Sequence, residues 1–160
     1  MSDVIVDGKT RVYWVPSISN ISAPTVAELD AGLDFTQRIT PDGLTVTPET
    51  ASVDNSNLAS TFNTERAGRR GFTVELTCKR GDTPTDDLPW TTLTYKETGF
   101  LAVRRILPYE TDWTAGQETE VYPVECGEPQ QTPPAPNEVA KFMSPLKLTS
   151  DPDTRAVVAA

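Results

Sequence analysis

The side chains that most often carry chemistry in proteins are sparse in this sequence. Its 160 residues include no histidine, which removes the commonest general base and the commonest transition-metal ligand. Ser-His-Asp and Cys-His catalysis are therefore excluded. The sequence also contains none of the glycine-rich or serine-centred motifs that hold phosphates and nucleophiles. We expect no enzymatic activity and no cofactor.

The acidic residues that stand closest together are Asp82, Asp86 and Asp87. Their oxygens are the kind of ligand that calcium prefers, but their spacing matches no calcium-binding loop. Carboxylates just before a helix also cap it and interact favourably with its dipole. The pattern favours helix capping, and no metal site is expected.

Two arginine pairs stand in a chain whose formal net charge is -9: Arg69-Arg70 and Arg104-Arg105. Such pairs could bind phosphate, or they could meet carboxylates of a neighbouring subunit. The acidic balance favours the second interpretation. The three tryptophans, Trp14, Trp90 and Trp113, are typical of core or interface anchors.

Length and composition bound the class of protein. A chain of 160 residues fits one domain and can bury roughly 70% of its unfolded surface without a metal or disulfide. Cys78 and Cys126 are not in a C-x-x-C motif, so we expect buried thiols. No apolar run approaches the roughly 20 residues that span a bilayer. The first residues lack the features of a signal peptide, so we expect synthesis in a cytoplasm.

Alternating patterns indicate a mainly β fold. Residues 72–80 place Phe72, Val74, Leu76 and Cys78 on one face, the signature of a half-buried strand. Short helices are expected at 25–32, where Thr25 and Glu28 form a capping box, and near 87–95. Other strands are expected at 11–15, 34–39, 44–51, 100–105, 119–127 and 139–149, with a turn at 41–43 and Pro48 at an edge or bulge.

Two segments suggest contact with other chains. Residues 52–71 are the least regular part of the interior, and connections of this length are usually functional or disordered. The predicted C-terminal hairpin, 119–127 with 139–149, is long and has little to cover it. A sheet must protect its edges, so this hairpin is predicted to pair with another subunit. The pattern as a whole predicts a β-sandwich or split barrel with one or two short α-helices.

Several segments resemble one known family. They are residues 10–16 (TRVYWVP), 51–62 (ASVDNSNLASTF), 65–70 (ERAGRR), 99–108, 121–124 and 133–138. Together they resemble the major tail proteins of long-tailed phages that infect actinobacteria, over roughly residues 10–150. The domain boundaries expected are an N-terminal arm at 1–10, a tail tube β-sandwich at 11–150 and a C-terminal tail at 151–160.

The resemblance implies a virion protein of the tail, made in the bacterial cytoplasm. It implies hexameric rings that stack into a tube, contacts with tape measure, tail terminator and distal tail proteins, and no membrane partner. DNA would pass through without specific binding, helped by an acidic surface that repels phosphates. The interface residues expected are Asn55, Asn57, Leu58, Phe62, Glu65, Arg66, Arg69, Arg70, Tyr122, Val124, Phe142 and Leu146.

Two alternatives have a similar architecture. One is an immunoglobulin-like capsid-decoration or adhesion module, which would not need a long hairpin. The other is the inner tube of a contractile injection system, which shares the fold of the tail tube and is separated from it poorly by sequence.

Overall fold

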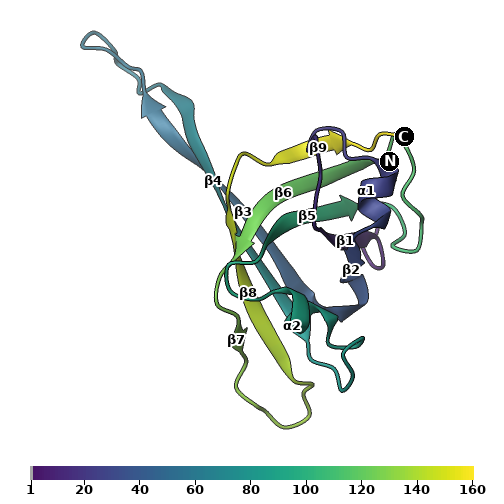
Figure 1. The fold of residues 1–160 in the computed structure, drawn as a ribbon. Coiled ribbons are helices and arrows are strands. Elements are labelled where there is room, and N and C mark those ends of the chain that lie inside the picture. The colour runs from purple at the N-terminus through teal and green to yellow at the C-terminus, as the bar shows by residue number, and fades with distance from the viewer. Residues whose placement is uncertain (1) are drawn as a thin grey trace.

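The chain folds into antiparallel β-strands with two short α-helices, as the computed structural model of residues 2–160 shows (Figure 1). The strands join into one nine-stranded sheet that does not close, with the main path β2-β1-β5-β6-β8-β4-β3. The expected mainly β fold with short helices is confirmed. In chain order the elements are β1 (Thr10–Val15), α1 (Val26–Asp30), β2 (Leu33–Asp34), the 3-10 helix η1 (Thr36–Arg38), β3 (Ile39–Asp54), β4 (Glu65–Lys79), α2 (Leu88–Thr92), β5 (Thr98–Arg105), β6 (Glu118–Cys126), β7 (Gln130–Gln131), β8 (Lys141–Leu148) and β9 (Asp153–Val157).

Strand β6 is where the sheet divides. One edge of β6 pairs with β5. The other edge pairs with β9 at its start, Glu118 opposite Val157, and with β8 at its end, Cys126 opposite Leu146. Strands β8 and β9 therefore diverge from a shared neighbour. The β8-β4-β3 half turns across the β1-β5-β6 half and encloses the main core between them.

The main core is built from alternating residues on the facing strands. It is formed by Val12, Trp14, Leu101, Val103, Tyr122, Val124 and Cys126 from one half, by Val74, Leu76, Cys78, Phe142 and Leu146 from the other, and by Phe35 and Leu93. The period-two pattern expected for 72–80 is confirmed for Val74, Leu76 and Cys78, while Phe72 is half-buried.

A second core lies on the opposite face of strands β1, β5 and β6. Tyr13, Val15 and Val121 pack there against Leu29 of α1 and against Trp113. These three strands are therefore buried on both faces. The C-terminal segment closes this core with Ala156 and Val158. In this segment Val158 is buried, whereas Val157 is exposed.

The two short helices follow their sequence signals. Thr25 caps α1: its hydroxyl accepts from the Glu28 backbone N–H at 3.1 Å, and the Glu28 carboxylate accepts from the Thr25 N–H at 3.0 Å. The expected capping box is confirmed. Helix α2 has a proline in its first turn, which suits a position without an intrahelical N–H bond.

The region 34–54 differs from its prediction. Residues 36–38 form η1 instead of a strand, and the expected turn at 41–43 is an irregularity inside β3. The register shifts there, between Ile39 opposite Cys78 and Leu44 opposite Leu76. Gly43 fits because a Cβ at this position would clash with the Thr77 carbonyl oxygen. A turn signal can therefore also serve a bulge within one continuous strand.

The expectation of an uncovered C-terminal hairpin is wrong. Strand β8 pairs with β4 from Lys79↔Lys141 to Val74↔Leu146, and its end pairs with β6. Both of its edges are therefore used inside the subunit. The long hairpin of this protein is β3–β4, which includes the residues 52–71 that sequence reasoning left without regular structure.

Residues 2–160, which the structure describes, contain neither a disulfide nor a membrane-spanning helix. Cys78 and Cys126 are free and buried, as expected. Burial raises the pKa of each thiol to about 12. Over residues 2–160, no helix has the length and apolar character needed to cross a membrane.

Candidate assembly surface

The outer half of the β3–β4 hairpin leaves the body of the protein. Strand β8 covers the edge of β4 only from Val74 onward. Beyond that point β3 and β4 pair with each other alone, from Glu49 opposite Gly71 to Asp54 opposite Glu65. We call residues 49–71 the distal ribbon. Figure 1 shows it projecting at the upper left, well away from the sheets.

A bulge twists the distal ribbon near its middle. Thr50 pairs with Arg70, but Ser52 pairs with Ala67, so β4 carries an additional residue between the two pairs. Gly68 lies in this bulge, where a Cβ would come within 3.1 Å of the Ala51 carbonyl oxygen. Such bulges increase the local twist of a ribbon and turn its end.

The loop at the end of the ribbon is held by its own short-range hydrogen bonds. The Asn55 N–H donates to the Thr64 carbonyl at 3.2 Å, and the Thr64 hydroxyl donates to the Asn55 side chain at 2.7 Å. Asn57 accepts from the Ala59 N–H at 3.0 Å. Asn and Asp side chains commonly form such turns. The polar residues of the loop therefore fix its shape and leave its apolar residues facing solvent.

The apolar side chains of the ribbon are uncovered. Leu58 is 106% exposed relative to its reference state, and Phe62 is 78% exposed. Val53 is exposed as well. Burying one such side chain yields about 1.5–3 kcal/mol. A projecting ribbon with apolar residues at its end is therefore a surface that gains from a partner.

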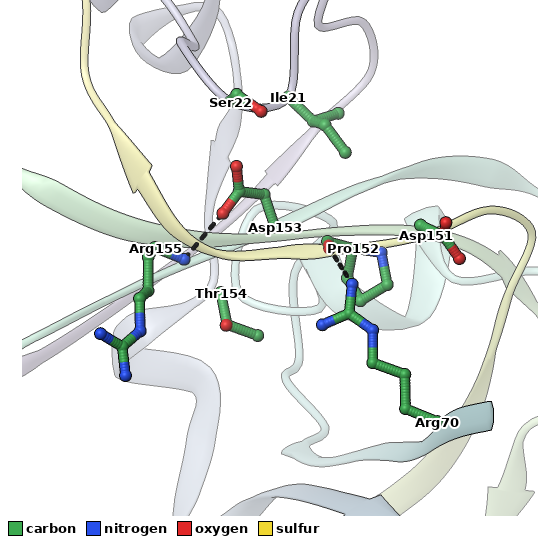
Figure 2. Close-up of a pocket in the computed structure, with 8 residues that line it drawn as sticks. All are labelled: Ile21, Ser22, Arg70, Asp151, Pro152, Asp153, Thr154 and Arg155. Carbon is green, nitrogen blue, oxygen red and sulfur yellow. Dashed lines mark hydrogen bonds between the residues drawn. The ribbon is translucent and has the colours of Figure 1, made fainter. Parts of the chain in front are cut away.

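The base of the distal ribbon contacts the C-terminal segment. Arg70 and residues 151–155 line a hollow of about 520 Å³, and Figure 2 shows the Arg70 guanidinium directed at Pro152. The Arg70 guanidinium donates to the Pro152 carbonyl at 3.4 Å and lies 5.8 Å from the centre of the Phe72 ring. Both Arg69 and Arg70 are exposed, and Arg70 also makes these contacts within its own chain.

The structure divides the residues that the sequence suggested as an interface. The exposed ones all lie on the distal ribbon: Asn55, Asn57, Leu58, Phe62, Glu65, Arg66, Arg69 and Arg70. The others, Tyr122, Val124, Phe142 and Leu146, are at most 1% exposed and belong to the main core of the subunit. These four residues alternate along β6 and β8 because they form a strand face that packs inside one subunit. They are therefore not part of the candidate surface.

Comparison with known proteins decides the family. The profile of the family described as phage tail tube protein matches residues 1–160. The chain belongs to the phage tail tube protein family. It is therefore a structural tail protein and not an enzyme. Among curated proteins, none matches the chain.

A solved structure supports the fold of this tail tube protein. It is a chain from the cryo-EM structure of the anti-feeding prophage (AFP) baseplate, symmetrised six-fold. The two chains are 16% identical, the match covers 95% of each, and the TM-score is 0.55. At this identity the likeness concerns the fold.

The tail tube protein has a polar sheet face that sequence reasoning did not assign. The outward side of β3, β4 and β8 carries threonines together with acidic and basic residues at alternate positions. This face is opposite to the one that forms the main core. Its members include Thr45, Thr47, Glu49, Thr73, Glu75, Thr77, Lys79, Lys141 and Lys147.

The second arginine pair of the tail tube protein acts within the subunit. Arg104 is fully buried and donates to the Pro108 carbonyl at 2.9 Å and to the Gln117 side chain at 3.2 Å. Its guanidinium lies 5.0 Å from the centre of the Trp113 ring. Burial, and then the nearby Arg11, lower the pKa of Arg104.

Arg105 pairs with Glu120 of the same chain at 2.6 Å. With both side chains of the pair engaged internally, the prediction that they meet a neighbouring subunit or a phosphate has no geometric support. Instead, Arg104 holds the loop between β5 and β6. No local sequence pattern predicts that an arginine will donate hydrogen bonds to carbonyls across a loop.

The aspartate cluster is likewise structural. Asp87 accepts from the Arg80 guanidinium at 2.9 Å and from the Gly81 N–H at 3.1 Å. The hydrogen bond from Arg80 is the main reason that the pKa of Asp87 is lowered. Asp87 makes no side-chain capping bond to α2, so that part of the capping interpretation is wrong. No group of three acidic, cysteine or histidine residues suited to a metal ion occurs in residues 2–160.

Proposed function

We propose that this chain forms hexameric rings that stack into the tail tube of a long-tailed phage of actinobacteria, and that DNA passes through the tube during ejection. The family supports a tail tube component, and the sequence resemblance supports the host and tail type. The structural observation that carries the proposal is the distal ribbon, because an isolated two-stranded ribbon is at best marginally stable in water.

The outer edge of the sheet offers a way to close a ring. Strand β3 is the last strand of the sheet and, among residues 2–160, pairs with β4 only. Its free backbone groups would be satisfied by a strand of a neighbouring subunit. Pro48 lies in this strand, as expected for an edge, and limits which register a neighbour can adopt.

Charge supports the role as a conduit. A tube must let DNA slide, and a chain of net charge -9 repels phosphates when several copies surround a channel. We propose the threonine-rich outward face of β3, β4 and β8 as the channel lining, because short hydroxyl side chains leave room for a duplex. The members named for this face carry two carboxylates and three ammonium groups, so the face is not acidic by itself and the acidic character comes from the chain as a whole.

The inner tube of a contractile injection system is the second candidate. The fold likeness to a chain of a prophage baseplate favours it. The two candidates share the tube and differ in whether a sheath surrounds it. Electron microscopy of whole particles decides between them, since a contractile tail shows a second, outer layer of density. In both cases tape measure, terminator and distal tail proteins are the partners proposed.

Negative-stain electron microscopy of the concentrated purified protein tests the proposal. We expect rings with six-fold averages, and tubes where rings stack. The double substitution Arg69→Glu and Arg70→Glu should block tube formation while circular dichroism still reports a folded subunit. Normal tubes from that variant would show that the ribbon does not contribute to the contact. Ring averages with a symmetry other than six-fold would overturn the hexamer.

A further inference from the structure

Among the exposed apolar side chains of this molecule, two groups lie at opposite ends of the same strand. One place is the tip of the distal ribbon, with Val53, Leu58 and Phe62. The other is near the start of β3, where Val6 and Ile106 are exposed. Monomeric proteins seldom expose grouped apolar residues without a binding role.

The second place is a groove. It has a volume of about 760 Å³ and lies between the N-terminal arm, the start of β3 and the loop after β5. We call it the basal groove. That volume is within the range of about 300–1,000 Å³ that holds compact ligands. Apolar contacts inside it come from Val6, Val12, Ile39, Leu44 and Ile106.

The backbone of the basal groove is strained at one residue. Ile106 has φ of +79° and is 57% exposed. A β-branched residue in this region of φ is an outlier, and such strain tends to collect at binding sites. The Ile106 N–H donates to the Lys9 carbonyl at 2.9 Å, which ties the N-terminal arm to the loop and holds this side chain outward.

The charges of the tip and the groove are complementary. Residues 54–65 of the tip hold two acids and no base: Asp54 and Glu65 face each other across the ribbon, and Arg66 comes next, opposite Val53. Hydrogen bonds from Ser56 lower the pKa of Asp54, so it remains a carboxylate at neutral pH. The groove contains Lys9 and Lys79 against the single acid Asp7, besides an arginine already paired with Glu120.

The tip cannot reach the groove of its own chain. The groove includes Ile39 at the first position of β3, and the tip follows Asp54 at the last. Sixteen residues of extended strand separate the two by roughly 50 Å. A tip that occupies a basal groove must therefore belong to another copy. A contact between two different surfaces of identical chains repeats from copy to copy, either closing into a ring or continuing as a stack.

We propose that the tip of the distal ribbon, through Leu58 and Phe62, docks into the basal groove of a second copy of this chain. This inference rests on the proposed tube and names the two surfaces that join successive layers. The tip supplies apolar side chains flanked by carboxylates, and the groove supplies an apolar floor flanked by ammonium groups.

Disulfide trapping tests the contact directly. The double variant Phe62→Cys with Ile106→Cys should form intermolecular disulfides under mild oxidation, seen as a ladder on non-reducing gels. The native thiols are buried and should not contribute. The matched control is Phe62→Cys with Tyr95→Cys, because Tyr95 is equally exposed but lies outside the groove. Equal ladders from both variants would overturn the proposal.

A mixing experiment adds a second readout. Phe62→Lys disables the tip, because it faces the groove ammonium groups, and Ile106→Glu disables the groove, because it faces the tip carboxylates; both side chains are exposed, so the subunits should fold normally. Each change should weaken stacking by about tenfold or more, since it replaces an apolar contact by a desolvated charge. Neither variant alone should form tubes. Mixed together, they should form paired layers that do not extend, because each retains one working surface. Tubes from either variant alone would overturn the proposal.

The outcomes separate this inference from the proposed function. A specific disulfide ladder without rings would support tip-to-groove docking and count against hexameric tubes. Rings or tubes without a specific ladder would support the tube and overturn the docking. Monomers that neither cross-link nor form rings would count against both.

Discussion

The body and the distal ribbon of this chain are built from the same kind of strand, with opposite surroundings. Strands β1, β5 and β6 are covered on both faces. Residues 49–71 of β3 and β4 are exposed on nearly every side chain. The body therefore has its interactions within one subunit, and the ribbon has few beyond its own backbone pairing. Stability of the subunit should depend on the first region, and assembly on the second.

The contrast also separates two tasks within one chain. The body has its own core, which holds the fold, so the residues of the ribbon do not need to pack inside the subunit. They can be chosen for contacts with other copies. A family whose role is structural would be expected to separate the two tasks in this way.

A matched pair of phenylalanines gives the largest expected difference. Phe142 is fully buried in the main core, and Phe62 lies at the ribbon tip. Phe142→Ala should lower the free energy of unfolding by about 3–5 kcal/mol, because it removes a large side chain and leaves a cavity. Phe62→Ala should change it by less than about 0.5 kcal/mol while reducing tube formation. Urea unfolding followed by circular dichroism measures the first effect, and electron microscopy measures the second. Similar unfolding energies for the two variants would contradict the division of roles.

A matched pair of arginines should differ less. Arg104→Met removes the donors that hold the carbonyl of Pro108 and the side chain of Gln117. Losing the hydrogen bonds of this charged donor should cost about 1.5–3 kcal/mol. Arg66→Met on the ribbon removes an exposed cation and should leave subunit stability nearly unchanged. Thermal unfolding of both variants checks this. A stable Arg104→Met protein would show that the loop after β5 is held by other contacts.

The smallest difference is expected at two threonines. Thr25→Ala removes the cap of α1 and should cost about 1 kcal/mol of unfolding free energy, whereas Thr61→Ala in the exposed loop should cost almost nothing.

The pH dependence of the unfolding free energy adds a check on the same cap. Backbone hydrogen bonding from Thr25 lowers the pKa of Glu28, so its contribution is present above the unfolded pKa of about 4.3 and disappears as the pH falls below it. Glu28→Gln should flatten this part of the stability curve, and an unchanged curve would contradict the assignment.

Much of the body could be predicted from sequence because its signals are local. The capping residues of α1, the alternation in 72–80 and the buried cysteines all follow from residue types at fixed spacing. The long hairpin was missed because Gly68 and the turn-forming residues 41–43 resemble loop signals, whereas both belong to bulges inside strands. Bulges depend on the partner strand, which sequence alone does not specify.

The candidate surface was predicted only in part, for a related reason. The residues of the ribbon were found because they are irregular and polar, with Leu58 and Phe62 among them. The alternating residues of β6 and β8 were assigned to an interface because nothing local shows which strands cover them. The basal groove was not foreseen, since it combines three segments far apart in the chain.

The two buried thiols bear on how long the assembled protein can last. Outside a cell there is no reducing pool to reverse oxidation, and a thiol reacts mainly as its thiolate. Because burial raises the pKa of Cys78 and Cys126 to about 12, almost none of either side chain is thiolate at neutral pH. In a tail component, this low thiolate content slows both the oxidation of the two thiols and the formation of disulfides between copies.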